Sequence, residues 1–383
     1  MRHFISFVLA LAISTSLAFG QPDSCRLRIS VITCAPGAEL YSLFGHTALR
    51  ITDSTRHQDV VFNYGTFDFS DPDFYSKFVR GKLDYFLNPE PFDGFMQFYQ
   101  EEQRGITEQE LNMTCAEKQA LLEALKTNLQ GSNKYYKYDF LFDNCTSRVR
   151  DQVQHNIPGV TMQAPLVPEG TTFRNMIHVY LDNGGQPWSK LGIDLLLGSR
   201  MDRPVTVNES MFLPDYLLKG VDSAKKGDKT PLVLQKKQLF SASPDLSPQN
   251  KHVPLIVFSV IAVVVLLLSQ WKQKAGTTLM LIIDSIGLYV TGLVGVLLLF
   301  MWFCTDHVAC AANYNLLWAL PTNLLAGFFI YKRPTWVRKY FLYLAFLQIA
   351  VLVAWIFLPQ QLNIAFLPVV IITAWRSFQL TFK

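Results

Sequence analysis

The sequence carries no large excess of charge of either sign. Its 34 Lys and Arg residues nearly balance its 30 Asp and Glu residues, which leaves a formal net charge of +4. Chains that bind nucleic acid show a clear basic excess, so the charge gives no reason to expect a nucleic-acid partner. The slight excess is explained by loops that lie next to apolar segments.

The sequence also lacks a lipobox. Residues 17–25 read LAFGQPDSC, without a Leu-x-Gly-Cys type motif directly before Cys25, so we expect no lipid anchor on the chain itself. Residues 1–20 instead combine a basic start, a short apolar run and a small-residue exit ending at Gly20. This order is typical of a cleavable export signal, with an uncleaved membrane helix as the alternative. Either form places the following residues outside the cytoplasm.

Cysteine is scarce, with six residues in the chain. Export to an oxidising compartment makes disulfides possible. Two pairs are close in sequence, Cys25 with Cys34 and Cys304 with Cys310, and either could be bridged. The sequence alone does not determine the pairing.

Long apolar runs are missing from residues 21–252 and dominate the chain after Pro254. The candidate membrane spans lie at residues 254–269, 277–303, 316–331, 342–358 and 364–375. Five transmembrane helices are therefore predicted. With an exported N-terminal part, the basic segments WKQK, YKRPTWVRKY and RSFQLTFK all fall on the cytoplasmic side, as the positive-inside rule requires. Asp284 interrupts the second run, where it either faces a partner inside the bundle or marks a lipid-facing groove.

The remaining residues predict a domain of mixed strands and helices over residues 21–220. Strands are expected at 25–33, 46–52 and 60–66, the last two as an antiparallel hairpin. A helix is expected over 114–129, where Thr114 and Glu117 form a capping-box pattern. Residues 221–252 are rich in Lys, Pro and Ser and are interpreted as a linker, so that the membrane domain covers residues 253–383.

One cysteine and one histidine are the candidates for chemistry. In the segment DNCTSRVRD, Asp143 or Asn144 is a plausible N-cap, which places Cys145 in the first turn of a helix. A helix start lowers the pKa of a thiol, and an imidazole is the usual base beside it. His46 is preferred because it follows Gly45 at the start of a strand, where glycine permits the close approach of another backbone. The alternative is a buried or disulfide-bonded Cys145 and a core histidine.

Several motifs together resemble one family. The segments FGHTALRI, VFNYGTFDF, GKLDYFL and FDNCTSRVRD occur in this order and are followed by NYNLLWALPTNLL in the membrane part. In these motifs the chain resembles the Lnb-type lipoprotein N-acyltransferases over essentially its whole length. The resemblance implies transfer of a fatty acyl chain from a membrane phospholipid to the α-amino group of the lipid-modified N-terminal cysteine of diacylated bacterial lipoproteins. It also implies an inner-membrane protein with a periplasmic catalytic domain.

The order of histidine and cysteine is also similar to that of the permuted papain-like enzymes, such as lecithin:retinol acyltransferase. The expected fold is therefore α+β, a permuted papain-like exported domain fused to an all-α bundle of five transmembrane helices. The resemblance makes Cys145 the nucleophile and His46 the base. It also implies a third polar residue on the following strand, for which Asn63 is the first choice and His57 the second.

Four further residues are candidate substrate contacts. Arg148 and Arg150 flank the cysteine and could neutralise a phosphate headgroup, although ion pairs with Asp143 or Asp151 are the structural alternative. Asp306 and His307 lie in the outer loop CTDHVACAANYN and could line the floor of the active site, or be a solvated loop. The expected chemistry needs no metal and no cofactor.

Two other functions fit the same residues. A papain-like cell-wall peptidase or amidase, similar to the NlpC-type enzymes, would use the same pair of side chains, but it has little need of five membrane spans. A membrane-anchored binding protein with a structural cysteine is the non-catalytic alternative. Rapid alkylation of Cys145 near neutral pH would argue against this second alternative.

Overall fold

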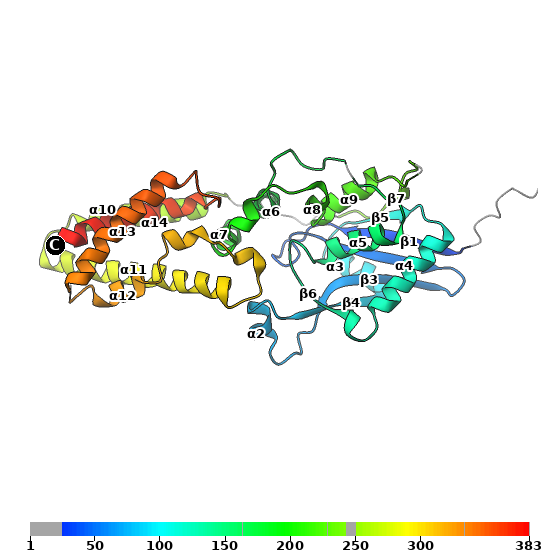
Figure 1. The fold of residues 1–383 in the computed structure, drawn as a ribbon, viewed down its shortest axis with the longest axis horizontal. Helices are drawn as coiled ribbons and strands as arrows, with labels where there is room; N and C mark the ends of the chain where they lie inside the picture. Colours follow the sequence, from blue (N-terminus) through cyan, green and yellow to red (C-terminus); the bar gives the residue numbers. More distant parts are fainter. Residues whose placement is uncertain (1–24, 163, 228, 243–249, 333, 383) are drawn as a thin grey trace, which may run out of the picture.

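The computed structural model describes residues 25–162, 164–227, 229–242, 250–332 and 334–382. The expected export signal at residues 1–20 lies outside the described residues. Figure 1 shows two parts placed end to end, a sheet covered by helices and an elongated bundle that contains the C-terminus.

The first part is built on one antiparallel sheet. Its strand order in the described chain is β6-β4-β3-β2-β1-β5-β7, and every neighbouring pair is antiparallel. The strands are β1 Leu27–Cys34, β2 His46–Asp53, β3 Gln58–Phe67, β4 Asp84–Pro91, β5 Ile106–Leu111, β6 Tyr135–Lys137 and β7 Val233–Phe240. Strands β1 to β3 confirm the strands and the hairpin predicted from the sequence.

Strand β7 lies inside the expected linker of residues 221–252. It pairs with β5 at the edge of the sheet, and its side chains are largely exposed, which is why the sequence gives no alternation of buried and exposed apolar residues there. Residues 233–240 therefore belong to the exported part of the chain rather than to a free tether.

Helices cover both faces of the sheet. On one face, α4 Cys115–Asn128, α5 Cys145–Asn156 and α9 Pro214–Ser223 pack on the central strands around a core that includes Val31, Leu49 and Val149. On the other face, α3 Phe92–Glu101 packs with Phe95 and Tyr99 against Ile32 and Ala48. The capping box predicted for α4 is present, since Thr114 accepts from the Glu117 amide and Glu117 accepts from the Thr114 amide.

Further helices lie between the sheet and the bundle (Figure 1). They are α6 Phe173–Asn183 and α7 Pro187–Leu196, while the short helices α2 Phe74–Val79 and α8 Val207–Ser210 interrupt the loops of the sheet domain. A second core around Phe173, Ile177 and Phe212 joins α6 to these loops.

The bundle contains α10 Val253–Ser269, α11 Lys274–Phe303, α12 Asn323–Phe329, α13 Thr335–Ala354 and α14 Leu367–Phe382. By length and composition, α11, α13 and the segment Ile364–Phe382 can each cross a membrane, and α10 is apolar but shorter. The third predicted span, residues 316–331, is not one continuous helix. It divides into a 3-10 turn at Tyr314–Leu317 and α12, because Pro321 between them cannot donate a helical hydrogen bond.

The broken segment packs closely on α11. A Cβ atom at Gly292 would lie 2.6 Å from the Leu324 amide nitrogen, and one at Gly295 would lie 2.2 Å from the Ala319 carbonyl oxygen. Small residues of this kind let helices approach closely inside a membrane. The Ser285 hydroxyl also donates to the Gly327 carbonyl at 2.9 Å.

Asp284 has a partner inside the bundle, one of the two possibilities left open by the sequence. The guanidinium of Arg376 on α14 donates to both of its carboxylate oxygens, at 2.8 and 2.6 Å. Both side chains are buried. The pair joins α11 to α14.

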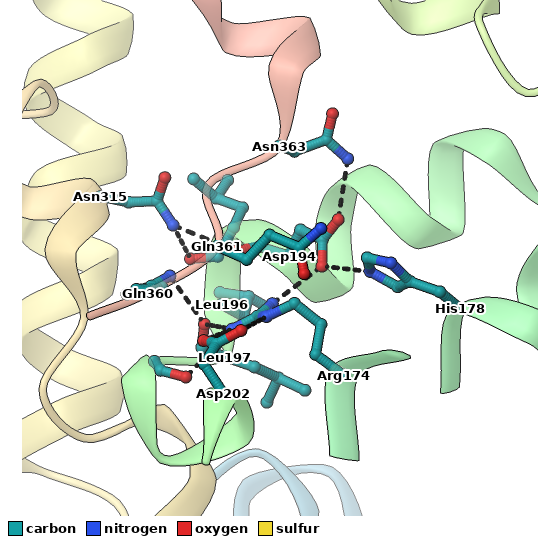
Figure 2. A network of polar contacts seen from close by, with 12 residues as sticks. Arg174, His178, Asp194, Leu196, Leu197, Asp202, Asn315, Gln360, Gln361 and Asn363 are labelled. Atoms are coloured by element: carbon teal, nitrogen blue, oxygen red, sulfur yellow. Dashed lines mark hydrogen bonds and ion pairs between the residues drawn. The ribbon is translucent and has the colours of Figure 1, made fainter. Parts of the chain in front are cut away.

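A buried polar network joins the two parts of the molecule (Figure 2). Arg174 on α6 forms ion pairs with Asp194 at 2.8 Å and with Asp202 at 2.8 Å, and His178 also contacts Asp194 at 2.8 Å. The membrane part completes the network with three amide side chains, Asn315, Gln360 and Asn363. This network fixes the exported domain against the outer end of the bundle.

Neither of the two disulfides that the sequence left possible is formed. Cys25, Cys34, Cys304 and Cys310 each carry a free thiol. The thiol of Cys145 is also free, which removes the alternative that it is half of a disulfide.

Candidate active site

Cys145 is the first residue of helix α5. Its N-cap is Asn144, whose side-chain oxygen accepts from the Ser147 amide at 2.8 Å, while Ser147 accepts in return from the Asn144 amide at 2.8 Å. The Asn144 amide group also donates to the carbonyls of Phe140 and Phe212. The cap is therefore held from both sides. At this position the backbone amide of Cys145 is one of the helix-start amides without an intrahelical acceptor, and the helix dipole favours negative charge.

His46 is the first residue of β2, directly after Gly45. Gly45 has φ +79°, and a Cβ atom there would lie 2.7 Å from the carbonyl oxygen of Cys34. The chain can therefore make this turn only with glycine, as the sequence indicated. Because α5 packs on β2 and β3, the imidazole of His46 lies near the thiol of Cys145, and each group shifts the pKa of the other.

The thiol of Cys145 is activated by its surroundings. Burial opposes its ionisation, but the charge of His46, hydrogen bonds from His46 and the Thr47 amide, and the Thr146 hydroxyl outweigh burial and lower its pKa from 9.0 to about 7. For His46, burial again favours the neutral form, yet the neighbouring thiolate and Asn63 raise its pKa above the ordinary value. These opposite shifts describe a thiolate–imidazolium pair.

Asn63 fixes the orientation of the imidazole. Its side-chain oxygen lies 3.0 Å from Nε2 of His46. An amide oxygen only accepts hydrogen bonds, so Nε2 carries the proton and Nδ1 is the nitrogen left for the thiol. The structure thus brings together Cys145, His46 and Asn63, as expected from the sequence.

Glu90 is a member of the site that sequence reasoning missed. The amide nitrogen of Asn63 donates to the Glu90 carboxylate at 2.5 Å, which holds the amide oxygen toward His46. Burial raises the pKa of Glu90, while His46 and Asn63 act in the opposite direction. Glu90 is a diagonal neighbour of Asn63 across β3 and β4, since Val61 pairs with Glu90 and Asn63 with Asn88. Only this register could have indicated the role of Glu90. It was not accessible from the sequence because strand β4 was not predicted.

An irregularity in β3 opens the space beside the thiol. The register with β4 shifts between Asn63 and Thr66, and Gly65 in this bulge has φ +91°. A Cβ atom at Gly65 would lie 3.6 Å from the Cβ of Cys145 and 3.7 Å from the ring of Tyr138. Bulges of this kind occur next to active sites because they redirect neighbouring side chains.

A second cysteine lies near the site in a different electrostatic state. Cys34 pairs with His46 across β1 and β2 and is fully buried. Burial raises its pKa to about 12, in spite of a hydrogen bond with Tyr99 and the charge of Arg104. Cys34 is therefore held as a neutral thiol and is no competitor for the nucleophile role.

The two arginines after Cys145 are engaged within the domain. Arg148 forms a two-pronged ion pair with Asp143, at 2.6 and 2.8 Å, and its guanidinium lies over the ring of Tyr136. Arg150 pairs with Asp151 and donates to the Asn208 carbonyl. This is the geometry of the structural ion pairs that the sequence left as the alternative.

The outer loop of the bundle reaches the exported domain. The His307 ring donates to the carbonyls of Phe78 and Val79, at 3.2 and 3.1 Å, and the Asp306 amide donates to the Arg80 carbonyl at 2.9 Å. Asp306 and His307 border an apolar pocket near the site but do not touch Cys145. His57, the second choice for the third position, lies in the exposed turn between β2 and β3, at the end of the hairpin far from His46.

Fold and site together define a class of protein in which a mixed α and β domain is joined to a bundle of apolar helices. The mixed domain carries the paired cysteine and histidine. Two family models match the chain, the Lnb N-terminal periplasmic domain over residues 18–178 and the Lnb transmembrane domain over residues 247–383. The chain belongs to the Lnb family, with a periplasmic domain followed by a C-terminal transmembrane domain.

Family membership suggests an acyltransferase-type enzyme of lipoprotein maturation, in the inner membrane with a periplasmic domain. No curated protein and no solved structure matches the chain.

Proposed function

We propose that this protein is a lipoprotein N-acyltransferase that works through a thioester on Cys145. The observation that carries the proposal is the thiol at the start of α5 beside His46, whose charge helps to lower the pKa of the thiol to about 7. This pair lies in a domain that matches the Lnb periplasmic model and is fixed to apolar helices. A thiolate beside an imidazolium is the arrangement of covalent acyl transfer.

In the first half-reaction, the Cys145 thiolate attacks the ester carbonyl carbon of a phospholipid. The tetrahedral intermediate carries an oxyanion, for which the backbone amide of Cys145 at the helix start is the available donor. When the carbon–oxygen bond breaks, His46 gives its Nδ1 proton to the leaving oxygen. A lysophospholipid departs, and the acyl group remains on the sulfur as a thioester.

In the second half-reaction, the α-amino group of the diacylated lipoprotein cysteine attacks the thioester. His46, now neutral, takes the proton from this amine, and the sulfur leaves as a thiolate paired with the imidazolium. Asn63 holds the imidazole in one orientation through both steps, and Glu90 holds Asn63. The residues need no metal or cofactor for this sequence of steps.

The resemblance to the Lnb-type and permuted papain-like enzymes also leads to two proposals about the fold. We infer a permuted papain-like domain, because His46 on an early strand precedes Cys145 on a later helix start. We also infer five membrane crossings, of which the third is the broken segment that contains α12. Both substrates then diffuse laterally within the outer leaflet, and neither acylated molecule has to leave the bilayer.

The test uses the full-length protein in membranes with a diacylated lipoprotein. Mass spectrometry of the lipoprotein N-terminus should show a third acyl chain with the wild type and none with Cys145→Ser, because a serine hydroxyl is far less acidic than the thiol. His46→Ala should be comparably inactive, and the double variant little worse than either one.

The intermediate provides a second measurement. With phospholipid and no acceptor, the wild type should accumulate a hydroxylamine-labile acyl group on Cys145. Substantial triacylated lipoprotein made by Cys145→Ser would overturn the covalent mechanism. Cleavage of peptidoglycan fragments without acyl transfer would instead favour the peptidase alternative.

A further inference from the structure

An apolar pocket lies where the exported domain meets the outer end of the bundle. Its volume is about 310 Å³. Its walls come from both parts of the chain and include Tyr85, Tyr138, Leu197, Met201, Met301 and Val308.

One wall of the pocket is shared with the candidate active site. Tyr138 lines the pocket, and its ring lies beside Gly65 on the side where the Cβ of Cys145 also lies. The ring stacks on Tyr85, with the two centroids 4.6 Å apart. The pocket therefore begins one aromatic side chain away from the thiol.

The opposite wall belongs to the membrane part. Met301 lies in the last turn of α11, one of the helices that can cross a membrane. Helix α2, which contributes Phe78 to the pocket, lies near this outer end (Figure 1). It is tied to the outer loop by the hydrogen bonds from His307. Its Tyr75 and Phe78 side chains are 80% and 51% exposed, as is typical of aromatic residues at a membrane surface.

Several polar groups around the pocket are already engaged by hydrogen bonds. The Asp139 carboxylate accepts from the amides of Leu141 and Phe142, at 2.8 and 3.0 Å. His307 is held by carbonyls of α2, and the Asp306 amide by the Arg80 carbonyl. What remains to contact an occupant is mainly aromatic and aliphatic surface.

We propose that this pocket holds the fatty acyl chain of the phospholipid donor, which reaches it from the outer leaflet between α2 and the end of α11. The inference rests on the proposed acyl transfer and specifies where the transferred chain lies. The occupant is an acyl chain because the pocket is apolar, lies one aromatic side chain away from the nucleophile and borders a membrane helix on its opposite side. Its depth then sets the chain length that the enzyme prefers.

Narrowing the pocket tests this assignment. Met301→Trp places a larger side chain in the wall, whereas Leu299→Trp makes the same change at an exposed position of the same helix. Transfer is measured from phosphatidylethanolamine that carries dodecanoyl or hexadecanoyl chains. Met301→Trp should lower the preference for the longer chain by about tenfold, since a few methylene groups in an apolar pocket discriminate to this degree.

The control and a second variant make the outcome unambiguous. Leu299→Trp should keep the wild-type ratio of the two chains, and Met301→Ala, which widens the pocket, should raise the preference for the longer chain. An unchanged ratio in both active Met301 variants would overturn the assignment.

Direct occupancy separates this inference from the proposed function. Cys145→Ser in vesicles that contain a phospholipid with a diazirine in its acyl chain should form crosslinks at Met201, Leu197 or Met301. If these crosslinks form but the wild type transfers no acyl chain, the pocket holds lipid and the proposed function fails. If the wild type transfers acyl chains but crosslinks form only at exposed bundle residues such as Ile286, the pocket assignment fails.

Discussion

The thiols of Cys34 and Cys145 lie near the same histidine, and their pKa values shift in opposite directions. Cys34 is buried at the end of β1 and its pKa is raised to about 12, whereas Cys145 at a helix start has a pKa lowered to about 7. The difference comes from the charges that each sulfur faces. Cys145 faces the imidazolium and a backbone amide, which favour its thiolate. For Cys34 the effect of burial on the pKa is the largest, and it favours the neutral thiol.

This contrast predicts the pH dependence of alkylation. Only the thiolate reacts, so the rate at Cys145 should rise with pH through a midpoint near its lowered pKa of about 7. Removing the imidazolium in His46→Ala should move the midpoint upward, toward the ordinary thiol value of 9.0. The measurement is iodoacetamide labelling at a series of pH values, read by peptide mass spectrometry. Peptides with Cys34 serve as the internal control and should stay unlabelled in the folded protein.

The series of side-chain contacts from Cys145 through His46 and Asn63 to Glu90 predicts graded effects on turnover. Asn63→Ala should lower turnover by on the order of tenfold to a hundredfold without abolishing it, because an orienting partner contributes less than the nucleophile. Glu90→Gln retains an oxygen that accepts from Asn63 and should have a small effect, whereas Glu90→Leu should approach Asn63→Ala.

Two comparisons check this prediction. Glu90→Leu should lose no further activity when it is combined with Asn63→Ala, since both act through the same imidazole. The opposite result is that His57→Ala lowers turnover by about tenfold to a hundredfold while Asn63→Ala has no effect. This result would transfer the orienting role to His57.

At the residue scale, the sequence predicts the main residues of the candidate site but not Glu90, the residue that holds Asn63 in place. Cys145 and His46 follow from local signals, a polar cap before a cysteine and a glycine before a histidine. Glu90 does not, because its role depends on the register of β4 against β3. A register between strands is a tertiary property, and no pattern near Glu90 in the sequence reports it.

At the scale of elements, Arg174 lies at the centre of the contact between the two parts of the chain. Its side chain and that of Asp194 are each 1% exposed. Their surroundings lower the pKa of Asp194, since the effects of His178 and Arg174 outweigh burial. The pair is completed by amide groups from loops of the bundle, so helices α6 and α7 and the outer loops form one unit (Figure 2).

Removing one partner of this pair should destabilise the junction. Arg174→Met leaves the Asp194 carboxylate buried without its ion pair to the guanidinium, and we expect a loss of about 3 kcal/mol in the free energy of unfolding. Arg203→Met breaks the exposed pair with Glu209 and should cost less than about 1 kcal/mol. Thermal unfolding in detergent can be followed with a dye that reacts with newly exposed thiols of Cys34 and Cys310. Equal midpoints for the two variants would contradict the assignment of the network as the joint.

The elements that the sequence predicts well have strong local signals. The β2–β3 hairpin and α4 are examples, with alternating apolar residues in the hairpin and a capping box in α4. Strand β7 has exposed lysines and glutamines on half of its length and is a strand because β5 offers an edge for pairing. The break before α12 follows from Pro321, within a run whose apolar composition alone suggested one continuous span.

At the scale of the whole molecule, the proposed five crossings give a defined orientation for each loop. A reporter inserted after Ala242 or between Cys304 and Asn313 should be periplasmic, and one after the C-terminus cytoplasmic. The loop between α12 and α13 is decisive. If residues 314–331 cross the membrane, a reporter at Lys332 should be cytoplasmic, whereas a segment that enters and returns would leave it periplasmic.

Fusions to alkaline phosphatase and to green fluorescent protein report the two sides. A periplasmic signal at Lys332 together with a cytoplasmic C-terminus would reduce the number of crossings and overturn the five-span proposal. The basic residues in that loop and in the first turns of α13 make the cytoplasmic outcome the expected one.

The ion pair between Asp284 and Arg376 also has a consequence for how the protein is made. The two residues are 92 positions apart, so α11 is synthesised well before the cation that neutralises its carboxylate. Until α14 arrives, Asp284 is an uncompensated charge in an apolar environment, which is costly. A chain that ends early therefore keeps a polar defect in its membrane part, and only the complete polypeptide removes it. The last helix therefore supplies the cation that completes the membrane part of the protein.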